Sequence, residues 1–221
     1  MLERLLAERH SCRAFRPDPV ARATIERLLS LAQRTASWCN TQPWHVHLVS
    51  GDRLDALRRD YVARQRGRSP AEAAPDLEFP LAYRGAYQDR RRACGFGLYA
   101  SLGIGREDRD GAQRQNLENF RFFGAPHLAV VSTARDLGVY GAIDCGGYIA
   151  TFLLAAQHLG LAAVAQAAVA VDSAFVRQSL GIADDRQVVA GISFGHEQTD
   201  HPANAFRVDR APIEQAVTWV D

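Results

Sequence analysis

Apolar residues recur with the period of a helix or a strand along the first part of the chain. Residues 2–8 predict a short amphipathic helix, and residues 23–35 predict a second, because their apolar positions fall at i, i+3, i+4 and i+7. Residues 44–50 alternate bulky and polar side chains, as a half-buried strand does. Gly51 and Asp52 then turn the chain into a charged helix that we expect to reach about Gln65.

The second half of the chain is more apolar and predicts the centre of the fold. Residues 127–133 form a nearly continuous apolar run, which indicates a strand in the middle of a sheet. Residues 143–159 are apolar on almost every side, so we expect a buried helix, ended by Gly160. Two further strands are predicted at 161–168 and 188–194, with a short helix from about Asp172 to Leu180 between them.

The region between these halves is irregular. Residues 66–82 contain Gly67 and three prolines, so we expect a loop or lid. Residues 83–92 are basic and aromatic, and they form either a helix beside a pocket or only a solvated charged face. We expect a single domain over 1–221, with a lid or insert at about 66–123 and an extended polar tail at about 196–221. The mixed helices and strands show no repeating βαβ unit and no glycine-rich dinucleotide fingerprint, which favours an α+β sandwich over a Rossmann fold.

Composition narrows the class of protein. The formal charge of +1 gives no overall field that would attract nucleic acid or an anionic membrane. Charges interrupt the N-terminus before a signal-peptide core can form, and no stretch is expected to span a bilayer, so we expect a cytoplasmic protein. The scattered cysteines favour neither a zinc site nor a disulfide framework; they are Cys12, Cys39, Cys94 and Cys145.

Two polar clusters are candidates for binding. Arg9, His10, Ser11 and Arg13 place forked cations and neutral donors within five positions, which suits a phosphate group. The alternative is that these side chains are simply solvated after a surface helix.

The second cluster is the loop from Ser37 to Trp44, which contains Trp38, Asn40 and Gln42. Its amides and hydroxyls suit the edge of a uracil-like ring. In the alternative interpretation, Ser37 and Asn40 bond the local backbone and Trp44 anchors the next strand.

Taken in order, Arg9-His10-Ser11-Cys12-Arg13 and Asn40-Thr41-Gln42-Pro43-Trp44 resemble two signatures of the FMN-dependent nitroreductase family. The resemblance covers nearly the whole chain. It continues through Phe122–Pro126, Leu159–Leu161, Ala165–Ala167, Gly191–Gly195 and Arg210–Pro212. Ala36, Trp38 and Cys39 depart from the usual residues, which affects the shape of that loop.

The resemblance implies a fold and a site. It implies a nitroreductase-like sandwich, with a central mostly antiparallel sheet flanked by helices, in an intertwined homodimer whose active sites lie at the subunit interface. Residues matching Arg9, Ser11 and Arg13 hold the flavin, and the loop at Ser37 and Asn40 reaches the flavin of the partner. The complete expected FMN-binding set is Arg9, His10, Ser11, Arg13, Ser37, Trp38, Asn40, Gln42, Ala165, Gln166, Ala167, Gly195, Arg207 and Arg210.

The resemblance also implies an activity. We expect NADH or NADPH to reduce FMN and the reduced flavin to reduce a nitroaromatic, quinone or related electron-poor acceptor, in a ping-pong cycle. No side chain is expected to act as a catalytic acid or base, and Arg13 is the candidate for stabilising charge on the ring. The alternatives are a redox-sensing module, or a dehalogenase, enone reductase or flavin-cleaving enzyme on the same fold. His45 and His47 face the same side of a strand, but we expect packing rather than metal binding.

Overall fold

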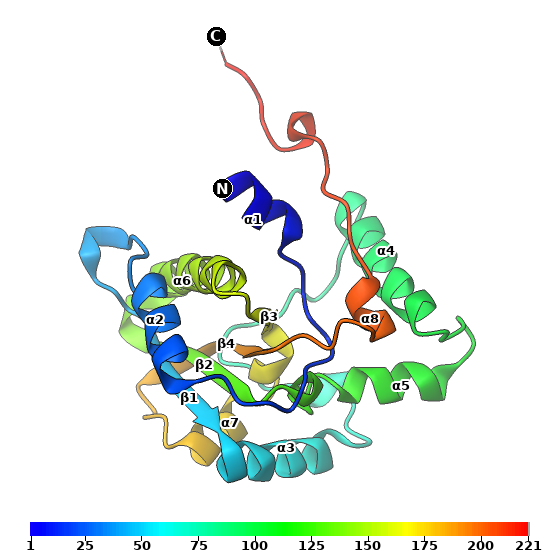
Figure 1. The fold of residues 1–221 in the computed structure, drawn as a ribbon, viewed down its shortest axis with the longest axis horizontal. Coiled ribbons are helices and arrows are strands. Elements are labelled where there is room, and N and C mark those ends of the chain that lie inside the picture. The colour runs from blue at the N-terminus through cyan, green and yellow to red at the C-terminus, as the bar shows by residue number, and fades with distance from the viewer. Residues whose placement is uncertain (221) are drawn as a thin grey trace.

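The computed structural model describes residues 1–220, the side chain of Pro70 excepted, and is built around a four-stranded antiparallel sheet. The strands are β1 (His45–Ser50), β2 (His127–Ala134), β3 (Ala162–Gln166) and β4 (Arg186–Gly195), in the order β1-β2-β4-β3 (Figure 1). The four predicted strands are confirmed, and β2 lies inside the sheet as its apolar run indicated. The predicted α+β class is confirmed as well.

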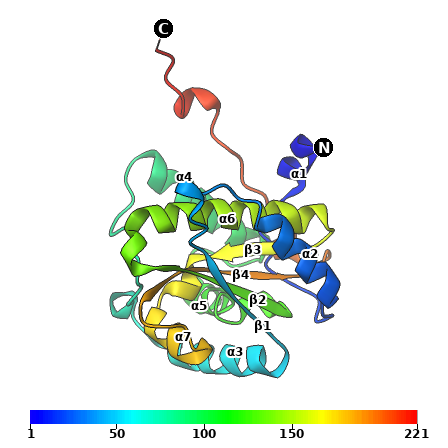
Figure 2. The same cartoon turned by 90° about the vertical axis from the view of Figure 1, so that its left-hand side faces the viewer.

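Helices cover both faces of the sheet. One face carries α2 (Arg22–Ala32) and α6 (Gly138–His158), and the other carries α3 (Gly51–Gln65) and α7 (Ser173–Leu180) (Figure 2). Side chains of β2 alternate between the two layers, with Ala129 and Val131 packed under α2 and α6, and Leu128 and Val130 packed over α3. Burial on both faces is the reason that this strand is continuously apolar.

A third group of elements lies together on the right of Figure 1. It contains α4 (Ala86–Ser101), α5 (Arg109–Leu117) and α8 (Pro202–Ala205). Of the two alternatives for residues 83–92, the structure shows a helix, which begins at Ala86 and continues to Ser101. Helix α5 had no clear apolar period and was not predicted. The N-terminal helix α1 (Leu2–Glu8) is confirmed with the predicted bounds.

Residues 66–82 are irregular, as predicted, apart from a single turn at Pro70–Glu72. The side chain of Asp76 accepts the backbone N–H of Val188 at 2.9 Å and forms ion pairs with Arg135 and Arg177. Burial opposes the charge of Asp76, but this N–H and the two guanidinium groups outweigh it, so the pKa of Asp76 is lowered from its ordinary value. This part of the segment is therefore fastened to α7 and β4.

A second buried carboxylate fastens the start of the same segment. Asp172 is 2% exposed, forms ion pairs with Arg64 and Arg68, and caps α7 by accepting the N–H of Phe175 at 3.2 Å. Residues 66–76 are thus held against the body of the protein by Asp172 near their start and by Asp76 at their end.

Helix α6 differs from its prediction in two ways. It begins at Gly138 and leaves one apolar face open, with Ile143 59% exposed and Val139 and Tyr140 beside it. The expectation of burial on almost every side is therefore wrong for the chain taken alone. The expectation that no stretch is long or apolar enough to span a bilayer is also wrong, since the helical stretch Arg135–His158 has sufficient length and apolar composition. Its inward face, which includes Cys145, Tyr148 and Phe152, nonetheless belongs to the protein core.

Helix α6 ends as predicted, because Gly160 takes a positive φ of 71°. The tail is less polar than expected. Beyond α8 it exposes Ile213, Val217, Trp219 and Val220 as it leaves the body of the protein (Figure 2).

Candidate active site

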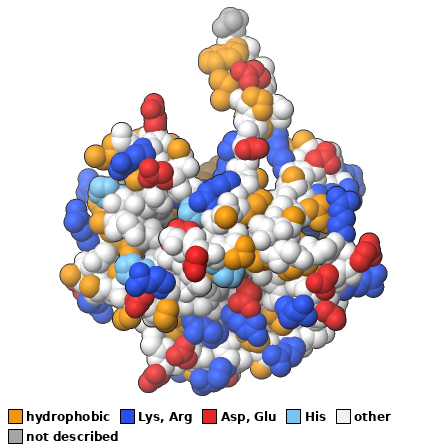
Figure 3. Space-filling view, turned by 45° about the vertical axis from the view of Figure 1, so that its right-hand side comes forward, with side chains coloured by type: hydrophobic (Ala, Val, Ile, Leu, Met, Phe, Trp, Pro, Cys, Tyr) orange, Lys and Arg blue, Asp and Glu red, His pale blue; other side chains and the backbone are white. Residues whose placement is uncertain are grey.

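The two ends of the chain meet at a cavity of about 620 Å³. Arginine side chains gather around the foot of the C-terminal tail, where this cavity lies (Figure 3). Six of the predicted binding residues line it or its rim. The lining residues are Leu6, Ala7, Arg9, His10, Ser11, Arg13, Cys94, Phe206, Arg207, Val208, Asp209 and Arg210.

The first wall of the cavity is an extended segment that lies along the edge of the sheet. After α1 the chain extends, and Ser11 forms a parallel bridge with Ala163 of β3. The N–H of Cys12 donates to the carbonyl of Ala163 at 3.3 Å. Successive side chains of an extended segment point to opposite sides, so Cys12 is fully buried while Ser11 and Arg13 line the cavity.

The second wall is the tail, and Asn204 joins it to the first. Asn204 is 2% exposed, and its Oδ1 accepts the N–H of Arg13 at 2.6 Å. Its Nδ2 donates to the carbonyls of Ala14 and Gln198 at 2.8 and 2.9 Å. Its own carbonyl accepts from the guanidinium of Arg207 at 2.5 Å. The sequence analysis missed Asn204, because nothing in its local pattern reveals a partner 191 positions away.

Four arginines and one acidic residue, Asp209, line the cavity. Within residues 1–220, none of Arg9, Arg13, Arg207 and Arg210 forms an ion pair with a carboxylate. Burial lowers the pKa of Arg13, and burial together with the charge of Arg210 lowers the pKa of Arg9. Arg9 and Arg13 are half-buried, whereas Arg207 and Arg210 are exposed. Four cations around one cavity are stabilised by an anion, and a phosphate group matches forked guanidinium donors.

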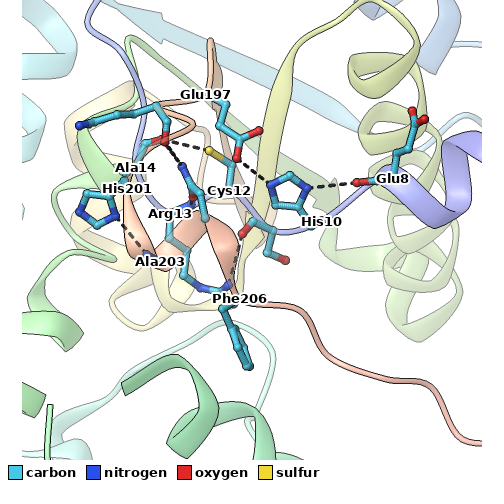
Figure 4. Close-up of polar contacts among 12 residues, drawn as sticks. Glu8, His10, Cys12, Arg13, Ala14, Glu197, His201, Ala203 and Phe206 are labelled. Atoms are coloured by element: carbon cyan, nitrogen blue, oxygen red, sulfur yellow. Dashed lines mark hydrogen bonds and ion pairs between the residues drawn. The ribbon is translucent and has the colours of Figure 1, made fainter. Parts of the chain in front are cut away.

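His10 is turned away from this role. Its Nε2 lies 3.0 Å from Oε1 of Glu197, and its Nδ1 lies 3.1 Å from the carbonyl oxygen of Glu8 (Figure 4). Both ring nitrogens therefore have hydrogen-bond partners within the chain. His10 therefore ties the start of the tail to the end of α1, and its ring nitrogens are engaged within the chain.

A smaller cavity of about 190 Å³ adjoins Arg13 on its other side. This cavity is lined by three primary amides, which lie on α5 or just after it, and by two aromatic side chains and a leucine. The lining residues are Arg13, Leu98, Tyr99, Gln115, Asn116, Asn119 and Phe123. Amide groups beside a guanidinium suit a planar ring with alternating donors and acceptors. The sequence analysis missed these amides, although Asn119 stands just before the Phe122–Pro126 motif.

The end of β3 has the shape expected of a close approach to a ligand. Ala165 and Ala167 are exposed, whereas Gln166 between them is buried. Small exposed side chains leave the backbone of this strand end accessible. Gly195, by contrast, is explained by packing, since a Cβ there would come within 2.7 Å of Pro126 Cδ.

The loop from Ser37 to Gln42 does not reach either cavity of its own chain. It lies at the start of α6, on the opposite side of the molecule from α8 (Figure 1). The N–H of Trp38 donates to the carboxylate of Asp144 at 3.2 Å, and its ring packs on Tyr140 at 4.6 Å. Asn40 and Gln42 have positive φ angles of 55° and 47°, so the loop is tightly turned.

Ser37 supports that turn, since its Oγ accepts the N–H of Gln42 at 2.9 Å. The local-backbone alternative is therefore correct for Ser37. Trp44 packs on Tyr148 at 5.1 Å and anchors the start of β1. The predicted members of this loop are thus collected on one surface, apart from the arginine-lined cavity.

The histidines on β1 face the same side, as predicted, with ring centroids 4.7 Å apart. Among the described residues no group of three or more His, Cys, Asp or Glu side chains is arranged to hold a metal ion.

Comparison with known proteins gives one consistent result. Residues 6–196 match the model of the nitroreductase family. The chain is 37% identical over 220 residues to the nitroreductase NfnB of Mycolicibacterium smegmatis, covering 98% of this chain and 92% of that one. It is 33% identical to a 4-nitrobenzoate reductase of Nocardioides sp., covering 96% and 87% of the two chains.

Solved structures agree. The FMN-dependent nitroreductase NfnB of Mycobacterium smegmatis, in complex with NADPH, superposes with a TM-score of 0.92 at 35% identity over 99% of this chain and 97% of that one. An FMN- and NADPH-dependent NfnB from Sphigopyxis sp. strain HMH gives 0.94 at 33% identity, over 100% and 99%.

Proposed function

The chain belongs to the nitroreductase family, and on that premise we propose that it binds FMN and uses NADH or NADPH to reduce nitroaromatic and related electron-poor acceptors. One observation carries the proposal most directly. Four arginines that form no ion pair with a carboxylate among the described residues line one cavity, and all four belong to the set that the sequence resemblance expects to bind FMN.

The two cavities fit the two ends of FMN. The dianionic phosphate matches the cations of the larger cavity, where Arg9 and Arg210 come from opposite ends of the chain. The pyrimidine edge of the flavin ring matches the amides of the smaller cavity. Arg13 lines both cavities, so it stands between the places assigned to the phosphate and to the ring.

Bound FMN supplies the hydride acceptance and release that this reaction needs. The side chains of this protein bind and orient. Arg13 places a positive charge beside the pyrimidine edge, where negative charge collects on reduction. The exposed strand end at Ala165 and Ala167 lets the backbone approach the ring closely. No acid–base residue is assigned, because the cofactor carries the chemistry.

The relatives support a choice of partners for the reaction. One related structure is a complex with NADPH, another is that of an NADPH-dependent nitroreductase, and one relative is a 4-nitrobenzoate reductase. We therefore propose NADPH as a reductant and nitroaromatics as acceptors for this chain. Steady oxidation of NADPH in the presence of nitrobenzoate would separate an enzyme from a flavin-binding sensor, which would be reduced only once.

We also propose a cytoplasmic homodimer that completes the site. The open face of α6 exposes Val139, Tyr140 and Ile143 beside Trp38, and a contiguous exposed apolar patch of this kind is typical of a protein–protein interface. The loop at Asn40 lies on this same surface, so a second copy seated there would receive the loop near its own cavity. We expect Ile143→Glu to convert the dimer to a monomer in light scattering and to weaken FMN binding.

The central test is binding of FMN by the purified protein and by arginine variants. We expect Arg9→Ala and Arg210→Ala each to raise the Kd for FMN about tenfold to a hundredfold, because a hydrogen bond to a charged group contributes roughly 1.5–3 kcal/mol. Arg22→Ala is the matched control, since Arg22 is exposed and paired with Glu26 on α2. A wild-type protein that cannot be reconstituted with FMN would refute the proposal.

A further inference from the structure

Gln166, at the end of β3, has a primary amide buried in the protein. The residue is 3% exposed, yet every polar atom of its side chain has a partner. Its Oε1 lies 2.5 Å from Oγ of Ser193, and its Nε2 lies 2.9 Å from the carbonyl oxygen of Asn119. Because burying an amide without hydrogen bonds is costly, these partners fix its position.

The chemistry of the partners also fixes which way the amide points. The carbonyl of Asn119 can only accept, so the NH₂ group of Gln166 must face it. The oxygen of Gln166 then faces Ser193, which is fully buried on β4 and donates its hydroxyl hydrogen. The amide therefore has a single satisfied orientation.

The orientation of the Gln166 amide in turn determines the orientation of the Asn119 side chain. The Oδ1 of Asn119 lies 3.5 Å from the same Nε2 of Gln166, while its Nδ2 donates to the carbonyl of Asn116 at 3.1 Å. The oxygen of this carboxamide is thus directed toward Gln166. One hydrogen of Nδ2 is used by Asn116, and the other is the polar group that remains for the amide-lined cavity.

We propose that Gln166 is a positioning residue, which holds Asn119 as a hydrogen-bond donor toward a carbonyl of the flavin ring. The inference rests on the proposed function, since it assigns the amide-lined cavity to the ring. A donor at this edge stabilises the reduced ring, which carries more negative charge, more than the oxidised ring. Gln166 therefore affects both the affinity for FMN and its reduction potential without touching the phosphate.

Gln166→Glu tests the proposal, because the two side chains have the same shape. A carboxylate still accepts from Ser193, but its second oxygen faces the carbonyl of Asn119, and it draws the NH₂ group of Asn119 away from the cavity. We expect the Kd for oxidised FMN to rise about tenfold, and that for reduced FMN about a further tenfold. For a two-electron couple, this additional factor lowers the midpoint potential of bound FMN by about 30 mV.

Two other variants keep the test decisive if Gln166→Glu does not fold. Asn119→Ala removes the proposed donor itself and should lower the potential in the same direction. Ser193→Ala removes the donor to Oε1 and should have a smaller effect of the same sign. Gln187→Glu is the matched control, because it makes the same chemical change on β4 at a residue that lies beyond the end of β3 and takes no part in these hydrogen bonds. It should leave the potential unchanged even where it lowers the melting temperature.

The outcomes separate the inference from the proposed function. Wild-type protein that binds FMN, with a potential that is the same in Gln166→Glu and Asn119→Ala, would overturn the inference and leave the proposed function standing. Loss of thermal stability alone would make Gln166 a residue of the core only. A wild-type protein that binds no FMN would overturn both.

Discussion

Asn204 offers the sharpest test of how the phosphate cavity is assembled. Asn204→Ala removes three hydrogen bonds, which join Arg13 N–H, Ala14 C=O and Gln198 C=O to one buried side chain. At about 1 kcal/mol net for each bond, the expected loss is about 3 kcal/mol of unfolding free energy. For a chain of this length that corresponds to a melting temperature lower by about 6–12 °C.

The variant should also weaken FMN binding, because the side chain of Asn204 anchors the backbone of Arg13, which lines the cavity. Urea denaturation without FMN measures the first effect, and fluorescence titration with FMN measures the second. Asn204→Asp keeps the acceptor for Arg13 but turns an oxygen toward two carbonyls, so it should also destabilise. Ala205→Ser, exposed in the same helix, is the control. A loss below about 0.5 kcal/mol for Asn204→Ala, the range of ordinary surface substitutions, would refute the reasoning.

Three further predictions concern the scaffold. The lowered pKa of Asp76 means that its stabilising contribution is present above the ordinary value of 3.8 and is lost as the pH falls below it, so Asp76→Asn should flatten the acid limb of a melting-temperature profile. Burial, with a smaller contribution from His196, lowers the pKa of His127, whose Nε2 accepts the N–H of Val20. The stability that neutral His127 contributes should therefore be complete above pH 6.5 and fall below it. A His127→Gln variant whose melting temperature depends on pH as in the wild type would contradict this. Burial raises the pKa of the Cys12 thiol to about 12, so a thiol reagent at neutral pH should modify exposed Cys39 and spare Cys12 until the protein unfolds, as peptide mass spectrometry can show.

The elements that follow a simple period were predictable from the sequence. Strand β2 is apolar on both faces because helices cover both, and α2 has one buried stripe because it covers one. Helix α5 was not predicted, because few of its residues are buried and its sequence is mostly polar. The apolar pattern of α6 predicted a helix but not its surroundings, because an apolar side chain has the same appearance in a core and at a surface left for another molecule.

The site could be predicted in part. The residues from Arg9 to Arg13 are recognisable in the sequence as a local polar cluster. The family resemblance added Arg207 and Arg210 from the C-terminal tail. Asn204 and Asn119 act through partners distant in the sequence, so no local spacing reveals them. His10 was assigned to the cofactor from its neighbours alone, whereas the structure gives both of its ring nitrogens to the chain.

The cavity between Arg9 and Arg210 has a consequence for the life of the protein in the cell. The two walls, residues 9–13 and 206–210, are far apart in the sequence, so a nascent chain has only the first of them until the second has emerged from the ribosome. The complete cavity therefore forms only after residue 210 has been synthesised, and a chain that stops before it lacks the second wall.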